Sequence, residues 1–536
     1  MPSFISFAPF LGALSLVQIT PAIGGFATGQ FTSEDLVTAY LRRIAEVNPL
    51  LHAVTEVNPD ALDVAKSLDA ERTAGIVRGP LHGVPIVIKN NIATDDKMNN
   101  TAGSYALLGS KVPEDSTVVT KLRDAGAIIL GKANMAQWAG CRSTVNSNGW
   151  SAYGGQVYGA YYPFQEPSGS SSGSAVSASI GLSLVALGTE TGSSISAPSS
   201  QNGVVGIKPS TGLTSRHLVI PWSSHQDTVG PIARTVKDAA GSYVLQTIAG
   251  TDPKDNYTST IPFDTIPDYV AACQEDGLRG ARIGVPRNAI LNTSIPDNSP
   301  IRDAYDQAID IIRALSANVS DPADFVNMTD YNVNRGGRPD ADGFDFMDID
   351  FYGDLAAYLA QLTYNPYNIT GVEDLILYTE SNPLENWPNK TVNVWQMTLN
   401  SVRKFGPYGG ATHWEMFQER IRIGEESTIL ATLEKYNLDA LVMPTTSATG
   451  PASIGQFPIV TVPLGFYPAD TPVTWGADSM IQTAPGVPFG LSFVGPRFSE
   501  EKLIKYAYAF EQATKIRSSK RPMVVPNIEL AEVISL

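Results

Sequence analysis

Cysteine is almost absent from this chain, and histidine is scarce. The 536 residues include two cysteines, Cys141 and Cys273, and five histidines. Two cysteines are too few for a disulfide framework, and no Cys/His cluster has the spacing of metal ligands. The histidines are scattered, so their positions do not indicate a His-based catalytic triad. No metal site is therefore predicted.

Positive charge is also in deficit. Lys and Arg number 37 against 53 Asp and Glu, which gives a net charge of −16 and a pI near 4.8. This balance argues against nucleic acid or an anionic membrane as the main partner. Charged residues make up only 17% and apolar residues 43%, which is typical of a compact globular protein with a large buried interior. The sequence leaves a monomer and a homodimer open.

Long apolar runs are nearly missing as well. Only Phe4 to Ala22 resembles the apolar core of a signal peptide, although a basic start is lacking and Pro9 interrupts it. Residues 1–30 are therefore treated as a separate segment of undecided role. The run favours the secretory pathway, with the cytoplasm as the alternative. No other segment is long and apolar enough to span a bilayer. Seven N-glycosylation sequons do not decide the question, because a chain rich in Asn, Ser and Thr carries several by chance: Asn99, Asn256, Asn292, Asn318, Asn327, Asn368 and Asn389.

Serine is what the chain has in abundance, and in one place. It fills 13 of the 33 positions from Ser168 to Ser200. Apolar residues between the serines predict a helix that leads into a buried strand around Leu187. Gly/Ser loops flank this unit at residues 169–173 and 192–194. Such loops present consecutive N–H groups beside hydroxyls, which can supply a nucleophile and an oxyanion site together.

A base for this chemistry is predicted upstream. Residues 79–89 (GPLHGVPIVIK) indicate a turn and then a short apolar strand that ends in Lys89. A lysine in that position either extends to solvent or sits in a poorly solvated site, where its pKa falls and the neutral amine can accept a proton. Lys132 follows its own strand in the same way and is the internal competitor for the role.

The remaining pattern alternates helices with strands, which predicts an α/β layered fold. Helices are expected over 31–49, 58–74, 354–362 and 414–435. A helix and then a strand are expected over 117–134. Further strands are expected over 280–286 and around Leu441 and Val460.

Several of these stretches closely resemble the amidase signature family of serine hydrolases. The resemblance rests on the two Gly/Ser loops, whose Ser170 and Ser194 have the family's spacing of 24, and on the lysine after a Gly-Val-Pro strand. Six further segments agree with those of the family in order and spacing. They are LGTE, GVVGIKP and GPIARTVKDAA, and near the C-terminus LDALVMPT, FPIVTVPLG and VPFGLSFVG. The resemblance implies one large α/β/α sandwich over residues 31–536, with a central mixed sheet surrounded by helices. It fades in an aromatic-rich region at about 280–413.

The family's chemistry then implies a role for each residue. Lys89, Ser170 and Ser194 would form a Ser-Ser-Lys triad that hydrolyses an amide of a small molecule through an acyl-enzyme, without a metal or an organic cofactor. Ser194 would be the nucleophile, and Ser170 would relay its proton to Lys89. The backbone N–H groups of Thr191, Gly192, Ser193 and Ser194 would hold the oxyanion. In the family, a cis peptide bond precedes the bridging serine.

Three residues depart from the family pattern. Asn90 stands where Asp usually follows the lysine. Ser196 replaces an arginine, so Glu190 is expected to lose that partner. Ser193 adds a side chain to the oxyanion loop. None of these changes removes a triad group, so activity is expected.

The substrate pocket is predicted from aromatic content. We expect it to involve the aromatic loop 149–167 and the divergent region, because binding residues concentrate on loops held by a rigid scaffold. The predicted lining residues are Gln156, Ser193, Phe344 and Phe351, with Trp395 as a further candidate.

Four alternatives remain open. Ser171 lies at the centre of a G-x-S-x-G pattern, the nucleophile elbow of a different hydrolase class. The same acyl-enzyme would serve an esterase or an acyltransferase. The triad also occurs in the A-type subunit of a glutamine amidotransferase, which needs a partner subunit. Lastly, the chain could be a catalytically silent binding protein.

Overall fold

The computed structural model describes residues 19–241, 243–291, 295–296, 299–342, 344–476 and 478–534. At the centre of these residues lies a mixed sheet of 11 strands. Its strands are β1 (Val54–Val57), β2 (Pro85–Lys89), β3 (Ile128–Ala133), β6 (Val185–Glu190), β7 (Val205–Lys208), β8 (Thr228–Ala233), β9 (Arg282–Gly284), β10 (Asn318–Ser320), β11 (Ala440–Pro444), β12 (Ile459–Phe466) and β15 (Pro488–Val494). They follow the order β1-β3-β2-β6-β8-β7-β12-β15-β11-β9-β10 across the sheet. Two short ribbons pair β4 (Trp150–Ser151) with β5 (Gly155–Gln156), and β13 (Thr474–Trp475) with β14 (Ile481–Thr483).

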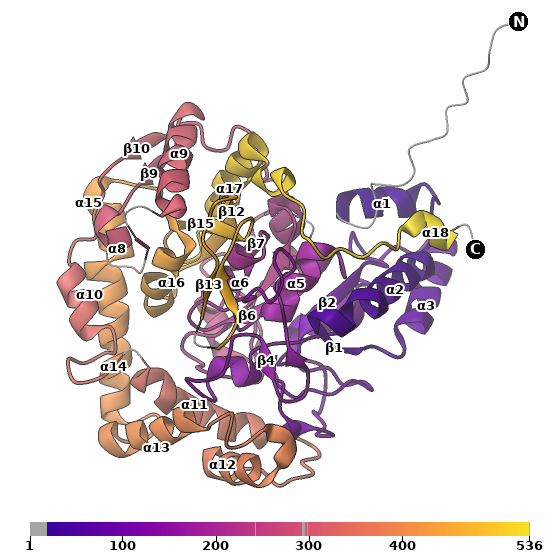
Figure 1. The fold of residues 1–536 in the computed structure, drawn as a ribbon, viewed down its shortest axis with the longest axis horizontal. Coiled ribbons are helices and arrows are strands. Elements are labelled where there is room, and N and C mark those ends of the chain that lie inside the picture. The colour runs from indigo at the N-terminus through magenta and orange to yellow at the C-terminus, as the bar shows by residue number, and fades with distance from the viewer. Residues whose placement is uncertain are drawn as a thin grey trace, which may run out of the picture.

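Helices surround this sheet, and Figure 1 shows β6, β7, β12 and β15 near the middle of the molecule, with β9 and β10 at the upper left. The helices of the sheet body are α1 (Ile19–Ala27), α2 (Ser33–Leu51), α3 (Ala61–Thr73), α4 (Thr117–Asp124), α5 (Ser172–Ile180), α6 (Ser196–Gln201), α7 (Val244–Ile248), α8 (Arg287–Leu291), α9 (Pro300–Ala314), α15 (Ile429–Tyr436), α16 (Thr445–Ile454), α17 (Glu500–Thr514) and α18 (Leu530–Ile534). No described helix combines the length and the apolar character needed to cross a membrane. The predicted fold class, a central mixed sheet surrounded by helices, is confirmed.

Three neighbouring strands create the position of the site. β2 runs parallel to both β3 and β6, and every residue of the three strands is buried. Strands buried on both faces need nearly continuous apolar runs, as in PIVIK and VALGTE. Helix α5 packs against β2 and β6 and is buried along its whole length. The carboxyl ends of β2 and β6 therefore meet beside the loop that precedes α5.

A separate group of helices, within residues 328–422, lies along the left and bottom of Figure 1 and includes most of the second half of the aromatic-rich region. These helices are α10 (Met328–Asn334), α11 (Asp345–Leu359), α12 (Val372–Ser381), α13 (Asn393–Phe405) and α14 (Ala411–Arg422). Helices α11, α12 and α13 share a hydrophobic core with Trp138, which comes from the sheet body. The ring of Trp138 makes edge-on contacts with Phe351 and Trp395, at centroid distances of 6.4 and 6.0 Å.

A fully buried ion pair fastens these helices to the sheet body. Arg142 Nη1 donates to Glu385 Oε2 at 2.8 Å, and neither side chain is exposed to solvent. Ser104 Oγ and Tyr105 N both donate to Glu385 Oε1 at 2.7 Å, and Gln137 Nε2 donates to Oε2. The carboxylate is thus saturated by donors from a segment more than 240 residues upstream.

Glu385→Ala is expected to lower the free energy of unfolding by about 3–5 kcal/mol, because Arg142 would stay buried without a counter-charge. Urea denaturation followed by circular dichroism measures the loss. Glu415→Ala is the matched control, since Glu415 is exposed on α14. Equal stability of the two variants would contradict the role given to this ion pair.

Most of the predicted elements are confirmed. Helices over 33–51 and 61–73, and the helix and strand within 117–134, occur as expected. So do the strands within 280–286 and at Leu441 and Val460. Thr32 begins α2 with a capping box, in which its side chain accepts from Asp35 N and the Asp35 side chain accepts from Thr32 N. The helix expected from residue 354 begins earlier, since α11 starts at Asp345.

The single helix expected over 414–435 is wrong, because a π-helical turn at Ile423–Ser427 separates α14 from α15. Gly424 lies so close to Gly455 that a Cβ on it would be 2.5 Å from the Gly455 Cα, so the chain adapts its winding to this contact. Most of the apolar run from Phe4 to Ala22 lies outside the described residues.

Candidate active site

Lys89 ends strand β2 and is completely buried. Its Nζ lies 2.7 Å from Ser170 Oγ, 2.8 Å from Thr189 Oγ1 and 3.2 Å from the Thr189 carbonyl oxygen. Thr189 belongs to the neighbouring strand β6. Burial lowers the pKa of Lys89 to about 7, although Asp227 and Glu190 act in the opposite direction. A lysine with this pKa is partly neutral at pH 7, and the neutral amine has a lone pair that can accept the Ser170 proton.

The two serines expected at the site lie on two loops that are bonded to each other. Ser170 precedes α5, is nearly buried and follows a cis peptide bond from Gly169, as the resemblance implied. Ser194 lies just before α6 and is 7% exposed. Ser171 N donates to the Ser194 carbonyl at 3.1 Å, and Ala136 N donates to the Ser170 carbonyl at 3.1 Å. The first bond joins the two loops directly, and the second holds Ser170 against the segment that follows β3.

The loop 191–194 is held through its carbonyl groups. The four acceptors, Thr191 to Ser194, receive hydrogen bonds from Gln226 Nε2, Ser453 Oγ, Ala197 N and Ser171 N respectively. Within the described part of the chain, the N–H groups of Gly192, Ser193 and Ser194 donate to no protein acceptor. A loop with fixed carbonyls and uncommitted N–H groups is suited to bind a negatively charged oxygen.

Glu190 has a backbone partner in place of the missing arginine. Its Oε2 accepts hydrogen bonds from Ile195 N and Ser196 N, both at 2.8 Å, and from Ser196 Oγ at 2.9 Å. As expected, Glu190 therefore has no arginine partner among the described residues, and two backbone N–H groups and the Ser196 hydroxyl take its place. Ser196 supplies a short hydroxyl where a guanidinium was expected, and Glu190 fixes the turn directly after Ser194.

Asn90, which also departs from the family pattern, does not contact Lys89 with its side chain. Its amide bonds Thr55 Oγ1 at 3.0 Å, and its Oδ1 accepts from Thr101 N and Oγ1 at 2.8 and 2.7 Å. The next residue, Asn91, donates to Thr189 Oγ1 at 3.1 Å. The surroundings of the Lys89 amine are therefore set by Thr189 and Asn91, which the sequence motifs did not indicate. The available signal was a threonine in the otherwise apolar end of a buried strand.

Two other lysines are equally buried but contact no serine. Lys132 Nζ donates to the Ile92 carbonyl at 2.6 Å and to Asn100 Oδ1 at 2.8 Å, and Lys208 Nζ donates to the Phe457 carbonyl at 2.8 Å. Burial lowers the pKa of Lys132 to about 7 and that of Lys208 to about 8. Because all three lysines have lowered pKa values, only contact with a hydroxyl distinguishes Lys89.

The nucleophile-elbow alternative does not fit the position of Ser171. This serine is fully buried, and its Oγ donates to the Thr189 carbonyl at 3.1 Å and accepts from Thr189 N at 3.2 Å. The hydroxyl therefore completes backbone hydrogen bonding at the end of β6 and faces no open space.

The residues predicted to line the pocket lie in different surroundings. Phe351 and Trp395 are fully buried in the core around Trp138, so the expectation that they line the pocket is corrected. The amide of Gln156 is bonded within its own loop, to Asn148 O at 2.7 Å and Val157 O at 2.9 Å, so it is a structural group there. Phe344 is 53% exposed and stacks on Trp222 at 6.5 Å.

The Asp227 carboxylate links Trp222, on which Phe344 stacks, to the loop 191–194. Asp227 accepts hydrogen bonds from Trp222 N, Ser223 N and Thr191 Oγ1. Burial raises the pKa of Asp227 to about 6. Phe344 therefore remains a candidate pocket residue, as does Ser193 within the loop itself.

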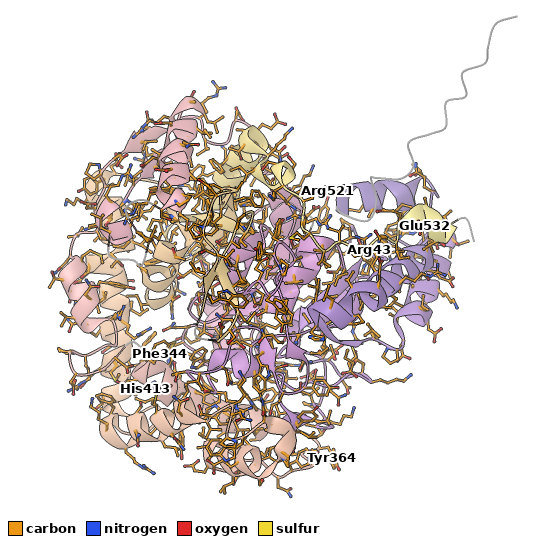
Figure 2. The ribbon with its side chains drawn as sticks, in the orientation of Figure 1. Arg43, Phe344, Tyr364, His413, Arg521 and Glu532 are labelled. Carbon is orange, nitrogen blue, oxygen red and sulfur yellow. The ribbon has the colours of Figure 1, made fainter. Side chains whose placement is uncertain are left out.

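Three side chains near the loop have the composition of a metal site. His225 Nδ1 and His413 Nε2 each lie 2.8 Å from Asp350 Oδ1. Figure 2 shows His413 among the helices that also carry Phe344. Gly409 N donates to His413 Nδ1 at 3.2 Å, so that nitrogen carries no proton and Nε2–H must donate to Asp350. A neutral His413 then has no lone pair left for a metal, and the three residues fit a hydrogen-bonded network better than a metal centre.

Known proteins resemble this chain over most of its length. A family profile described as Amidase matches residues 35–332. A putative amidase of Arthroderma benhamiae is 47% identical over 501 residues, which cover 93% of this chain and 82% of that protein. The A-type subunit of the glutamyl-tRNA(Gln) amidotransferase of Acidothermus cellulolyticus is 32% identical over 518 residues, with 92% and 94% covered. The crystal structure of the peptide amidase from Stenotrophomonas maltophilia matches with a TM-score of 0.82 and 34% identity, over 95% of this chain and 98% of that one.

The profile covers more than half of the chain, and the relatives span nearly all of it. The eleven-stranded sheet and the helices around it agree with the fold of the solved amidases. The chain therefore belongs to the amidase signature family, and it is an amidohydrolase of that type.

Proposed function

We propose that this amidohydrolase cleaves a linear amide of a small molecule with a triad of Ser194, Ser170 and Lys89. The observation that carries the proposal is the contact of 2.7 Å between the buried Lys89 amine and Ser170 Oγ. Ser170 contacts the buried Lys89 amine, and the next residue, Ser171, is bonded through its backbone to Ser194, which suits a Ser170 hydroxyl that relays protons between the two. The relation to a solved peptide amidase supports an amide as the substrate.

The reaction would proceed in two halves through an acyl-enzyme. In the first half, Ser194 Oγ bonds to the carbonyl carbon, its proton moves to Ser170 Oγ, and the Ser170 proton moves to Lys89 Nζ. Collapse of the tetrahedral adduct breaks the C–N bond, and the lysine proton returns through Ser170 to the leaving amine. In the second half, water takes the place of Ser194 as attacking group. The acid is then released, and the Ser194 hydroxyl is regenerated.

The negative oxygen of each adduct would be bound by N–H groups of the loop 191–194. Those donors are already oriented by the four carbonyl contacts, so little reorganisation is needed during the reaction. Removal of one such donor typically lowers kcat by about 10²- to 10³-fold. The hydrogen bonds that the turn after Ser194 donates to the Glu190 carboxylate keep the loop in place.

Labelling with a fluorophosphonate, followed by peptide mapping, tests this proposal. The expected adduct is on Ser194, because its hydroxyl is the one activated through Ser170. Since the pKa of Lys89 is about 7, the labelling rate should rise about fivefold from pH 6 to pH 7 and level off above pH 8, as the amine becomes neutral. An adduct on Ser171, or a rate that does not change over this range, would contradict the triad.

A further inference from the structure

A cavity of about 480 Å³ lies at the far end of helix α5 from Ser170. The C-terminal end of α5, strand β12, the end of α17 and the segment 515–529 form its walls. In Figure 1 that segment runs from α17 to α18, which packs against α2. The volume falls in the range of sites for small organic ligands.

Cationic side chains dominate the lining of this cavity. Six of them contribute, against the two acids Glu511 and Glu529: Arg43, Arg234, Lys515, Arg517, Lys520 and Arg521. Figure 2 shows Arg43 and Arg521 beside the C-terminal segment. The chain as a whole carries a net charge of −16, so this gathering of positive charge runs against its composition.

Three of the arginines form the inner wall and have a structural role. Arg43, Arg234 and Arg517 donate to backbone carbonyls of residues 178–181, at 2.7 to 3.1 Å. These bonds satisfy the carbonyl groups at the end of α5, which need donors there. A carbonyl is neutral, however, so the positive charges of the three guanidinium groups are not compensated by these contacts.

The outer wall has no comparable structural explanation. Lys515, Lys520 and Arg521 are exposed, and none of them forms an ion pair within the described residues. The α5 carbonyls do not need these three cations, because the inner arginines already bond them. Their shared orientation toward one cavity is therefore best explained by a ligand.

The two acids do little to neutralise the cavity. Glu529 lies 4.0 Å from Arg43, and half of its side chain is exposed. Glu511 accepts hydrogen bonds from Val236 N and Gln512 Nε2, and burial raises its pKa to about 8, so it is largely uncharged at neutral pH. Burial and the nearby charges of Arg517 and Arg43 lower the pKa of Arg234 to about 9, as expected where positive charge is in excess.

Apolar residues complete the lining, among them Val462, Pro463, Ile516, Val525 and Pro526. A ligand that fills the cavity must therefore match cations on some sides and apolar surface on others. We propose that the cavity binds a small organic oxyanion that carries at least two negative charges, as phosphate or carboxylate groups, on an apolar body. Arginine and lysine together are the side chains that bind such groups.

Isothermal titration calorimetry with phenyl phosphate and with phthalate tests the proposal. The ionic strength is held at about 0.1 M, so that long-range interactions between the probe and distant charges are screened. Both probes carry two charges on an aromatic ring, and the tighter one identifies phosphate or carboxylate as the preferred group. The triple variant Lys515→Gln, Lys520→Gln, Arg521→Gln should bind the tighter probe about tenfold more weakly or worse, since it loses charge-assisted hydrogen bonds.

A matched control removes three cations elsewhere. Lys66→Gln, Arg279→Gln and Lys502→Gln change the net charge equally, and all three are exposed and paired with acids away from the cavity. This variant should bind like the wild type. The proposal is overturned if neither probe binds at millimolar concentration, if both variants lose affinity equally, or if inorganic phosphate binds as tightly as phenyl phosphate.

Discussion

Ser194→Ala is expected to lower kcat for amide hydrolysis by roughly 10⁴-fold or more, because no other hydroxyl can take over the attack. Ser170 is bonded to Lys89, and Ser171 is bonded to the backbone of Thr189. The fold should persist, because the bonds that hold residue 194 come from its carbonyl group and from the turn that follows it. Release of ammonia or amine from a set of linear amides measures the effect, and fluorophosphonate labelling should disappear with it.

Ser177→Ala is the matched control for this variant. Ser177 lies on α5, seven residues after Ser170, and its buried hydroxyl has no hydrogen-bond partner among the described residues. Removing an unpaired buried hydroxyl has little effect on stability, so this variant should keep its activity. If Ser194→Ala retained kcat within tenfold of Ser177→Ala, the nucleophile would have to be another residue.

The short motifs singled out Lys89 and Ser170, which the structure brings into contact, because each motif is set by a short stretch of sequence. A glycine-rich loop, a helix start and a strand end are set by a few consecutive residues, so Lys89, Ser170 and the loop 191–194 could be located in the sequence. The contact between Lys89 and Ser170 could not be predicted from these motifs, since the two residues are 81 positions apart in the sequence. It follows from β2 and β6 being parallel neighbours, which places Lys89 beside Thr189 and below the loop before α5.

Side-chain direction was the harder part to predict. Phe344 lies at the start of α11, and its side chain is exposed. Phe351 lies within the same helix, and its side chain is buried in the core. The difference arises because Trp138, from a distant segment, fills the space against Phe351. The pocket predicted from aromatic content stays a prediction, which Phe344 still fits because it is exposed and stacks on Trp222. Nothing in the sequence indicated that Glu190 would accept hydrogen bonds from the backbone N–H groups of Ile195 and Ser196.

The chain also contains the means to test whether burial or contact makes a lysine catalytic. Lys89 and Lys132 are both fully buried, both lie at the carboxyl end of a buried strand, and burial lowers the pKa of each to about 7. They differ in what the amine touches. Lys89 contacts a hydroxyl of the site, whereas Lys132 contacts a carbonyl and an amide.

Lys89→Met is therefore expected to lower kcat by about 10²- to 10⁴-fold, the usual contribution of a general base. Lys132→Met should lower stability to a similar degree, because it also leaves buried acceptors unpaired, but should keep kcat per folded molecule within a few fold of wild type. Amide hydrolysis, normalised to the folded fraction from circular dichroism, separates the two effects. In Lys89→Met the residual rate should no longer follow an ionisation near pH 7. If Lys132→Met lost as much kcat as Lys89→Met, burial alone would matter, and the contact of 2.7 Å with Ser170 would not identify the base.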